Sequence, residues 1–252
     1  MSKKTNPKMS TSRVYVLAIA AVLVLGGVSS YAFVTSRPTG SPATQTATET
    51  ITEKAVNAYA SIPGGDILRT ETDADILWNA NDPYYGYNKD PIVALVHIDS
   101  IDGGRTYSPI SEQYVFPQTI GKMSVREVYK GDVKSGEKLS YYRPGGTVTY
   151  DEYWNSLNKQ QQDKILHLNN GKKPTDKKYI QDKFTDDIDV EAGKDYVVFL
   201  IPQSSKDGKN QEYLIDGFQY GLREAKGSGT EITVLNNNTK EWEALSSIVK
   251  LN

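Results

Sequence analysis

The sequence predicts a mainly β fold, a β-barrel or sandwich of OB-like type with one inserted helix, preceded by an N-terminal transmembrane helix. Two continuous apolar runs, 92–98 and 196–201, are typical of strands that are buried on both faces. Shorter alternating runs separated by glycine-containing turns indicate further strands of the same domain. A charge-free apolar run at 14–34 is long enough to cross a bilayer as a helix.

The N-terminal segment determines the expected topology. Four basic residues and no acidic ones precede the apolar run: Lys3, Lys4, Lys8 and Arg13. By the positive-inside rule, the basic tail 1–13 stays in the cytoplasm and the rest of the chain is exported. We expect 14–34 to be an uncleaved signal anchor in the cell membrane, with the C-terminal domain outside. The alternative is a signal peptide that is cleaved after Ala32, which would make the protein secreted.

A linker and one domain follow the apolar run. Residues 35–54 are rich in Thr, Ser and Pro and contain almost no large apolar side chain. Such a segment cannot bury enough surface to offset its ordering entropy, so we expect a disordered linker. The composition becomes globular at about residue 55, and 55–252 is long enough for one extracytoplasmic β-rich domain.

Composition excludes several kinds of chemistry. The chain has no cysteine, so it has no disulfide, thiol nucleophile or cysteine-ligated metal site. For an exported domain, this absence indicates a surface that does not depend on disulfides, such as that of a Gram-positive cell envelope. The formal net charge of −2 gives no indication of a nucleic-acid partner. We expect no cofactor.

The first half of the domain predicts three extended segments. After the buried run at 92–98, the Asp-Gly-Gly sequence at 102–104 predicts a turn, and 107–114 predicts a short extended piece. Apolar and polar residues alternate over 122–129, as in a half-buried strand, which the Lys-Gly-Asp sequence at 130–132 ends.

The second half of the domain predicts further strands and turns, with one helix among them. Its predicted strands and turns are 138–142, the turn at 144–146, the strongly apolar 196–201, the hairpin turn at 206–209, 212–215 and 231–235. Thr149 and Glu152 fit a capping box at the start of the helix. Asn170 and Gly171 predict its end.

Three segments between residues 92 and 222 carry a resemblance to a known fold. They are a strand ending in a Lys-Gly turn at 125–132 (VREVYKGD), a Gly-Gly segment at 143–146 (RPGG) and a buried strand introduced by Gly-Lys at 192–200 (AGKDYVVFL). In this order they resemble the OB-like barrel of netrin-type and metalloprotease-inhibitor domains, over about half the chain. The resemblance implies the fold alone, because the inhibitors act through an N-terminal cysteine and this chain has none.

Acidic residues before the 196–201 run suggest a weak metal site. On a predicted strand, Asp187, Asp189 and Glu191 would face the same side and offer carboxylate oxygens to calcium. Their spacing does not match a calcium-binding loop, and a solvated acidic face is the favoured interpretation. The two histidines, His97 and His167, are expected to be structural.

Aromatic side chains are the candidate binding residues. The chain has 17 Tyr and three Trp but only five Phe. Tyr84, Tyr85 and Tyr87 fall in a predicted loop, where core packing explains them less well, and Trp154 lies in an aromatic and acidic cluster. Tyr and Trp combine a flat apolar face with a polar edge, which suits sugar rings and protein interfaces. Strand preference is the alternative explanation for the tyrosines in general.

These observations favour a binding or interaction module at the cell envelope, anchored in the membrane and contacting wall glycan or a surface protein. The sequence contains no H-E-x-x-H, G-x-S-x-G or Walker motif, so an enzyme is not favoured. Two alternatives stay open: a carboxylate-dependent hydrolase, which requires two converging carboxylates, and an inhibitor-like barrel that acts on a surface partner.

Overall fold

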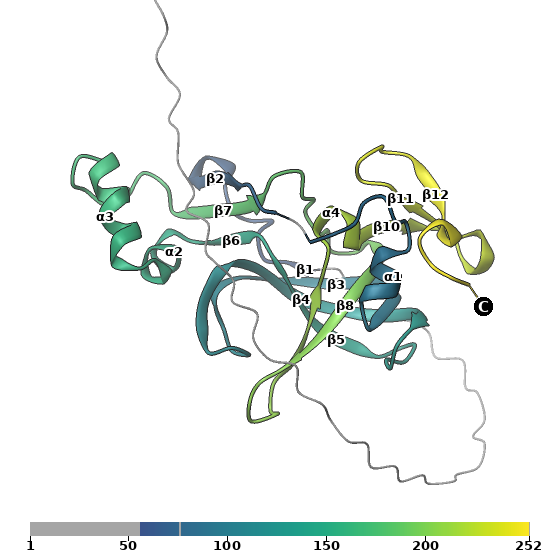
Figure 1. The fold of residues 1–252 in the computed structure, drawn as a ribbon. Helices are drawn as coiled ribbons and strands as arrows, with labels where there is room; N and C mark the ends of the chain where they lie inside the picture. The colour runs from purple at the N-terminus through teal and green to yellow at the C-terminus, as the bar shows by residue number, and fades with distance from the viewer. Residues whose placement is uncertain (1–55, 76, 252) are drawn as a thin grey trace, which may run out of the picture.

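The computed structural model describes residues 56–75 and 77–251 (Figure 1). The expected cytoplasmic tail, transmembrane segment and linker, 1–13, 14–34 and 35–54, lie outside the described residues. Within the described part, no helix has the length and apolar character needed to cross a membrane.

The described residues form a mainly β fold, as expected. The strands are β1 Val56–Asn57, β2 Ile67–Thr72, β3 Ile92–Ser108, β4 Gln113–Lys130, β5 Lys138–Pro144, β6 Gly146–Thr149, β7 Tyr179–Phe184, β8 Asp195–Ser204, β9 Gln211–Ile215, β10 Leu222–Lys226, β11 Thr233–Leu235 and β12 Trp242–Ala244. The helices are α1 Tyr85–Lys89, α2 Tyr150–Ser156, α3 Lys159–Leu168 and α4 Phe218–Gly221, with 3-10 turns at Gly64–Asp66, Gly229–Glu231 and Leu245–Ser247.

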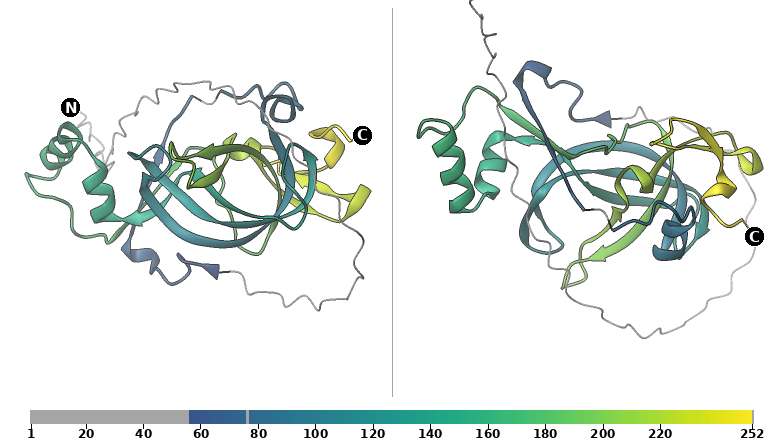
Figure 2. Two further views of the ribbon diagram at one scale, coloured as in Figure 1. Left: turned by 90° about the horizontal axis from the view of Figure 1, so that it is seen from below. Right: turned by 45° about the horizontal axis from the view of Figure 1, so that its top comes forward.

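Five strands of the large sheet pair in a closed ring. β3 pairs antiparallel with both β4 and β8, β4 pairs antiparallel with β5, β5 pairs parallel with β9, and β9 pairs antiparallel with β8. Figure 2 shows the long strands β3 and β4 curving around the middle of the molecule. Helices α2 and α3 are inserted between β5 and β8 and project at one end (Figure 1).

The apolar run at 92–98 is buried on both faces, which confirms the prediction. Ala94, Val96 and Ile98 point into the core inside the ring. Val93 and Leu95 point to the other side, where they pack with side chains of the C-terminal segment. The continuous apolar pattern therefore arises because one strand separates two cores.

A smaller sheet of three strands, in the order β2-β7-β6, lies beside the ring. β2 runs parallel to β7, and β6 runs antiparallel to it. Its small core consists of Val148, Tyr150 and Ile180, with Trp154 of α2 packed against it.

The predicted turn at 102–104 is wrong, because these residues lie within β3. The pairing of β3 with β4 shifts register between Ile101 and Gly103, and Gly103 has φ +144°. A glycine at such a bulge bends a long strand without ending it. The predicted extended piece at 107–114 is likewise divided between the end of β3 and the start of β4.

The single predicted helix is in fact two helices. The capping box of Thr149 and Glu152 is present at the start of α2, as predicted. Leu157 then takes an extended conformation, with φ −76° and ψ 141°, and ends the helix. Asn158 and Gln161 form a second capping box that starts α3. The second capping box provides hydrogen-bond acceptors for backbone N–H groups at the start of α3 that have no partner within the helix. A new helix can therefore begin there without leaving these groups unpaired.

Candidate functional site

The predicted binding tyrosines lie at a short helix, where the sequence predicted a loop. Tyr84 is the N-cap of α1, which contains Tyr85 and Tyr87. The side chain of Asp82 accepts a hydrogen bond from the backbone N–H of Tyr84 at 2.9 Å, which stabilises the turn that leads into the helix. Pro91 follows closely, and the helix ends before it because the residue preceding proline disfavours helical geometry.

All three tyrosines are half-buried and packed against neighbouring segments. The hydroxyl of Tyr84 donates to the carbonyl of Ser246 at 2.8 Å, and Tyr87 packs against the core that contains Val93. Trp154, the fourth predicted residue, lies on α2 at the other end of the molecule from α1 (Figure 1). The structure therefore brings the three tyrosines together and separates Trp154 from them.

Trp78 is the centre of the aromatic cluster beside α1. Its ring stacks on Tyr220 with a centroid distance of 5.8 Å and an interplanar angle of 14°. It contacts Tyr85 and the buried Phe199 edge to face, at 5.3 and 5.7 Å. The sequence prediction did not include Trp78 or Tyr220. They are 142 positions apart along the chain and meet only in the folded domain.

Two glycines allow Trp78 to reach this position. A Cβ atom at Gly86 would lie 2.4 Å from the indole ring and 2.7 Å from Phe199, and a Cβ atom at Gly217 would also lie 2.4 Å from the indole. Gly217 has φ +82°, a conformation that glycine adopts without strain. The indole is therefore held between α1 and the turn before α4.

We expect Gly86→Ala to lower the free energy of unfolding by about 1–3 kcal/mol, because the added methyl group overpacks the Trp78 site. Urea unfolding of the full chain in mild detergent, followed by tryptophan fluorescence, measures this change. Gly65→Ala is the control, because a Cβ atom there has no neighbour within 4 Å. Equal stability of the two variants would contradict the close packing described.

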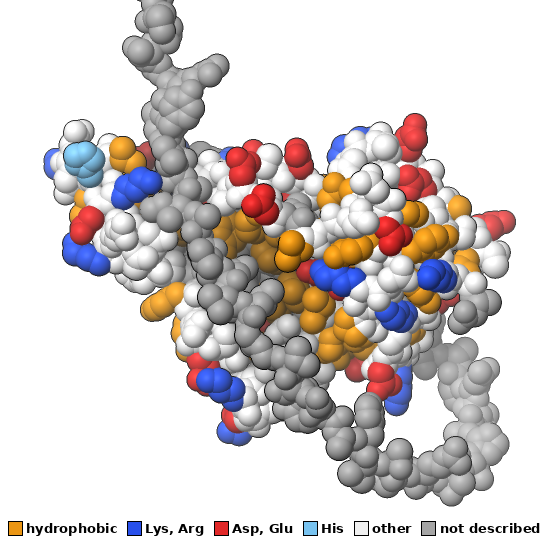
Figure 3. Space-filling view, in the orientation of Figure 1, with side chains coloured by type: hydrophobic (Ala, Val, Ile, Leu, Met, Phe, Trp, Pro, Cys, Tyr) orange, Lys and Arg blue, Asp and Glu red, His pale blue; other side chains and the backbone are white. Residues whose placement is uncertain are grey.

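A cavity of about 100 Å³ lies beside Trp78. The apolar part of its wall consists of Trp78, Ala80, Pro83, Phe199, Tyr220 and Ile248. The polar part consists of Asp82, Arg223, Asn236 and Asn238. In Figure 3, hydrophobic side chains gather at the middle of the molecule and extend toward α1, with basic side chains among them. An apolar wall with a few convergent polar groups is the usual character of a small-ligand site.

Arg223 supplies a buried positive charge to this cavity. Its residue is only 8% exposed, and burial lowers its pKa. The guanidinium Nε donates to the carbonyl of Tyr220 at 3.1 Å, and Nη1 donates to the carbonyl of Leu235 at 3.2 Å. These bonds fix the orientation of the guanidinium at the cavity wall.

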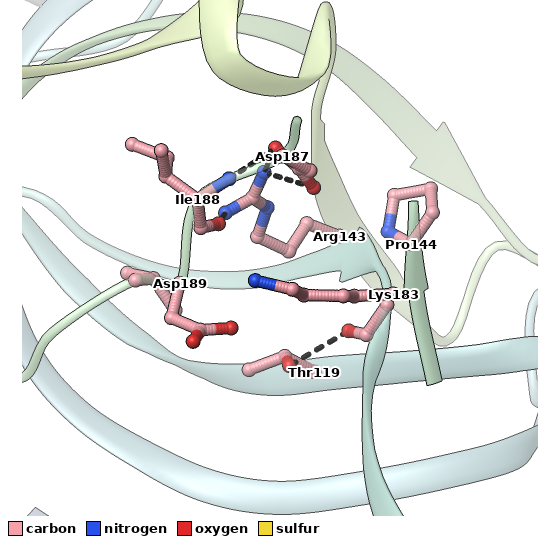
Figure 4. A pocket seen from close by; sticks show the side chains of 9 residues that line it. Thr119, Arg143, Pro144, Lys183, Asp187, Ile188 and Asp189 are labelled. Atoms are coloured by element: carbon pink, nitrogen blue, oxygen red, sulfur yellow. Dashed lines mark hydrogen bonds and ion pairs between the residues drawn. The ribbon is translucent and has the colours of Figure 1, made fainter. Parts of the chain in front are cut away.

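The predicted acidic site near β8 has a different arrangement. Residues 187–191 lie in a loop, so the expected strand is wrong. The carboxylate of Asp187 is buried and accepts two hydrogen bonds from Arg143, at 2.6 and 2.8 Å (Figure 4). Asp189 is exposed and lines the same small cavity as Asp187, and Glu191 pairs with Lys194 at 2.8 Å.

The loop changes the electrostatic role of Asp187. Burial raises the pKa of Asp187, and the adjacent Arg143 guanidinium opposes that effect. The cavity next to this pair measures about 10 Å³, room for about one water molecule. Within the described residues, no group of three or more His, Asp or Glu side chains is arranged to hold a metal ion.

The remaining polar candidates have structural partners. His97 Nδ1 lies 2.6 Å from the carboxylate of Asp195, which tethers the start of β8 to β3. His167 lies in the last turn of α3. Asp73, which directly follows β2, accepts a hydrogen bond at 2.7 Å from Thr185, which directly follows β7.

The Trp78 cavity is thus the place where aromatic faces, amide groups and a buried cation converge. Comparison of the chain with protein-family models, curated proteins and solved structures gives no match.

Proposed function

We propose that this chain is a binding module of the cell envelope, anchored in the membrane by 14–34, with its β-rich domain outside and wall glycan as its ligand. The proposal depends chiefly on one observation, the Trp78 cavity with its aromatic wall and its buried Arg223. The apolar run at 14–34 with its preceding basic residues supports the location.

Sugar chemistry suits the side chains of the cavity. The C–H faces of a pyranose ring pack on aromatic side chains, and Trp78 and Tyr220 provide such surface. Sugar hydroxyl groups act as both donors and acceptors, which the amide of Asn238 and the carboxylate of Asp82 complement. A ligand of this kind uses each type of group that lines the cavity.

We further propose that the ring of β3, β4, β5, β9 and β8 is an OB-like barrel, as the resemblance to netrin-type and metalloprotease-inhibitor domains implies. The five-membered ring and the helices between β5 and β8 support this interpretation. The fold serves as a rigid support, because the cavity lies where the outer face of β8 meets β10 and the C-terminal segment.

The test is co-sedimentation of the full chain, in mild detergent, with purified cell-wall sacculi. We expect Tyr220→Ala to lower the affinity for sacculi about tenfold, because it removes one aromatic wall of the cavity, a loss of roughly 1.4 kcal/mol. Tyr85→Ala is expected to weaken binding less, since Tyr85 supports Trp78 from outside the cavity lining.

Tyr114→Ala is the matched control, because Tyr114 is 61% exposed and does not line the cavity. It should bind sacculi as the unaltered chain does. Absence of co-sedimentation by the unaltered chain, or equal binding by the Tyr220→Ala and Tyr114→Ala variants, would refute the proposed glycan ligand at this cavity.

A further inference from the structure

The two most buried arginines of the described residues have different partners. Arg143 is 3% exposed and forms a two-bond ion pair with the buried Asp187. Arg223 is 8% exposed, yet within residues 56–75 and 77–251 its hydrogen bonds go only to two backbone carbonyls. The chain thus neutralises one buried guanidinium internally and leaves the other without a carboxylate.

The acidic groups nearest to Arg223 are already engaged. Glu243 favours the charged form of Arg223 through its field but forms no hydrogen bond with it; its carboxylate accepts hydrogen bonds from Asn236 at 2.6 Å and Ser247 at 3.3 Å. Asp82, on the cavity wall, accepts from the backbone of Tyr84. A buried charge without a directly bonded counter-charge is costly, and a carboxylate of a ligand would offset that cost.

We infer that Arg223 binds a carboxylate group of the ligand in the Trp78 cavity. This inference rests on the proposed function and specifies it: the ligand is an acidic sugar, or another small organic acid of the wall, rather than a neutral sugar. A guanidinium presents its N–H groups in a planar fork that matches a carboxylate. Because Nε and Nη1 are held by carbonyls, the remaining N–H groups are oriented before the ligand arrives.

The carboxylate of Asp82, the other charged group on the cavity wall, further restricts which ligands can bind. Asp82 is half-buried and would repel a second negative group, while it accepts hydrogen bonds from hydroxyl or amide donors. The cavity, at about 100 Å³, therefore suits the end of a ligand that carries one carboxylate with neutral donors beside it. A muramic acid has this chemistry, and so does the C-terminal end of a short wall peptide.

The experiment compares ligands that differ by a carboxylate. The full chain in mild detergent is titrated by calorimetry with N-acetylmuramic acid and with N-acetylglucosamine, which lacks the lactyl carboxylate. We expect the acid to bind at least tenfold more tightly, as a charge-assisted hydrogen-bonded pair provides. The dipeptide D-alanyl-D-alanine forms a third arm, which distinguishes a peptide carboxylate from a sugar carboxylate.

Two substitutions test the role of Arg223 in binding the carboxylate. Arg223→Gln removes the charge and should abolish the preference for the acid, while Arg223→Lys keeps the charge and should retain part of it. Urea unfolding of each variant establishes that it is folded. If Arg223→Gln does not fold, the titration of the Arg223→Lys variant decides, because loss of the planar fork alone should lower the preference several-fold.

The outcomes separate this inference from the proposed function. Preference for either carboxylate ligand that is lost in Arg223→Gln supports the inference. Equal binding of the acid and the neutral sugar, or a preference that survives in Arg223→Gln, overturns it while leaving a glycan-binding function in place. Binding of the free acids without any binding to sacculi supports the role of Arg223 and refutes the wall-glycan function.

Discussion

Asp187→Asn is expected to lower the free energy of unfolding by about 3–5 kcal/mol, the largest effect of any single change considered for this chain. Arg143 and Asp187 are each about 3% exposed at the side chain and face each other in a closed geometry. Removing the negative charge leaves the Arg143 guanidinium buried and without a counter-charge, while the amide oxygen of Asn can still accept the bond from the Ile188 N–H. Urea unfolding monitored by tryptophan fluorescence measures the change.

Asp189→Asn is the matched control for this prediction. Asp189 belongs to the same loop but is exposed, so we expect its substitution to change stability by less than about 0.5 kcal/mol. Calcium chloride should leave the unfolding curve of the unaltered chain unchanged, because the Asp187 carboxylate is occupied by Arg143. Stabilisation by calcium that disappears in both variants would instead support the metal site suggested by the sequence.

Stability should decrease as the pH rises from about 4 to about 7. Burial is the main cause that raises the pKa of Asp90 and of Asp182 to about 6, from 3.8. A folded state with a raised carboxyl pKa binds the proton more tightly than the unfolded chain does. The stabilisation is therefore fully present below about pH 4 and is lost as the pH rises through 6, by about 3 kcal/mol for each residue.

Asp90→Asn isolates one of these contributions. Asp90 is 1% exposed, and neither of its carboxylate oxygens has a hydrogen-bond partner. We expect the variant to be about 2–3 kcal/mol more stable than the unaltered chain at pH 7.5 and of similar stability at pH 4. Asp163→Asn, at a side chain that is 54% exposed, is the control. Parallel pH profiles of the Asp90→Asn variant and the unaltered chain would contradict the assignment.

Local patterns predicted the elements of this fold well where one signal dominated. The buried runs that became β3 and β8, and the capping box that starts α2, depend on neighbouring residues and are visible in the sequence. The glycines at 103 and 104 were misleading, because a turn and a bulge use the same residue type for the same conformational freedom. Only the partner strand distinguishes the two.

The candidate site was only partly predictable for a similar reason. The tyrosines at 84, 85 and 87 attracted attention because they form a cluster along the chain. Trp78, Tyr220 and Arg223 meet through the packing of α1 and α4 against β8 and β10, and no local pattern marks them. The need for glycine at positions 86 and 217 is likewise invisible in the sequence, because it arises from their close approach to Trp78 in the folded core.

The closed ring also dictates the order in which this protein can fold. The hairpin of β3 and β4 involves neighbouring residues and can form early, whereas β3 and β8 pair residues about a hundred positions apart, such as Ile92 with Leu200. Until β8 and β9 have been synthesised, Ala94, Val96 and Ile98 have no core to enter. The chain should therefore fold slowly, in milliseconds to seconds, and a nascent chain that ends before β8 would keep the apolar residues of β3 exposed to chaperones and proteases.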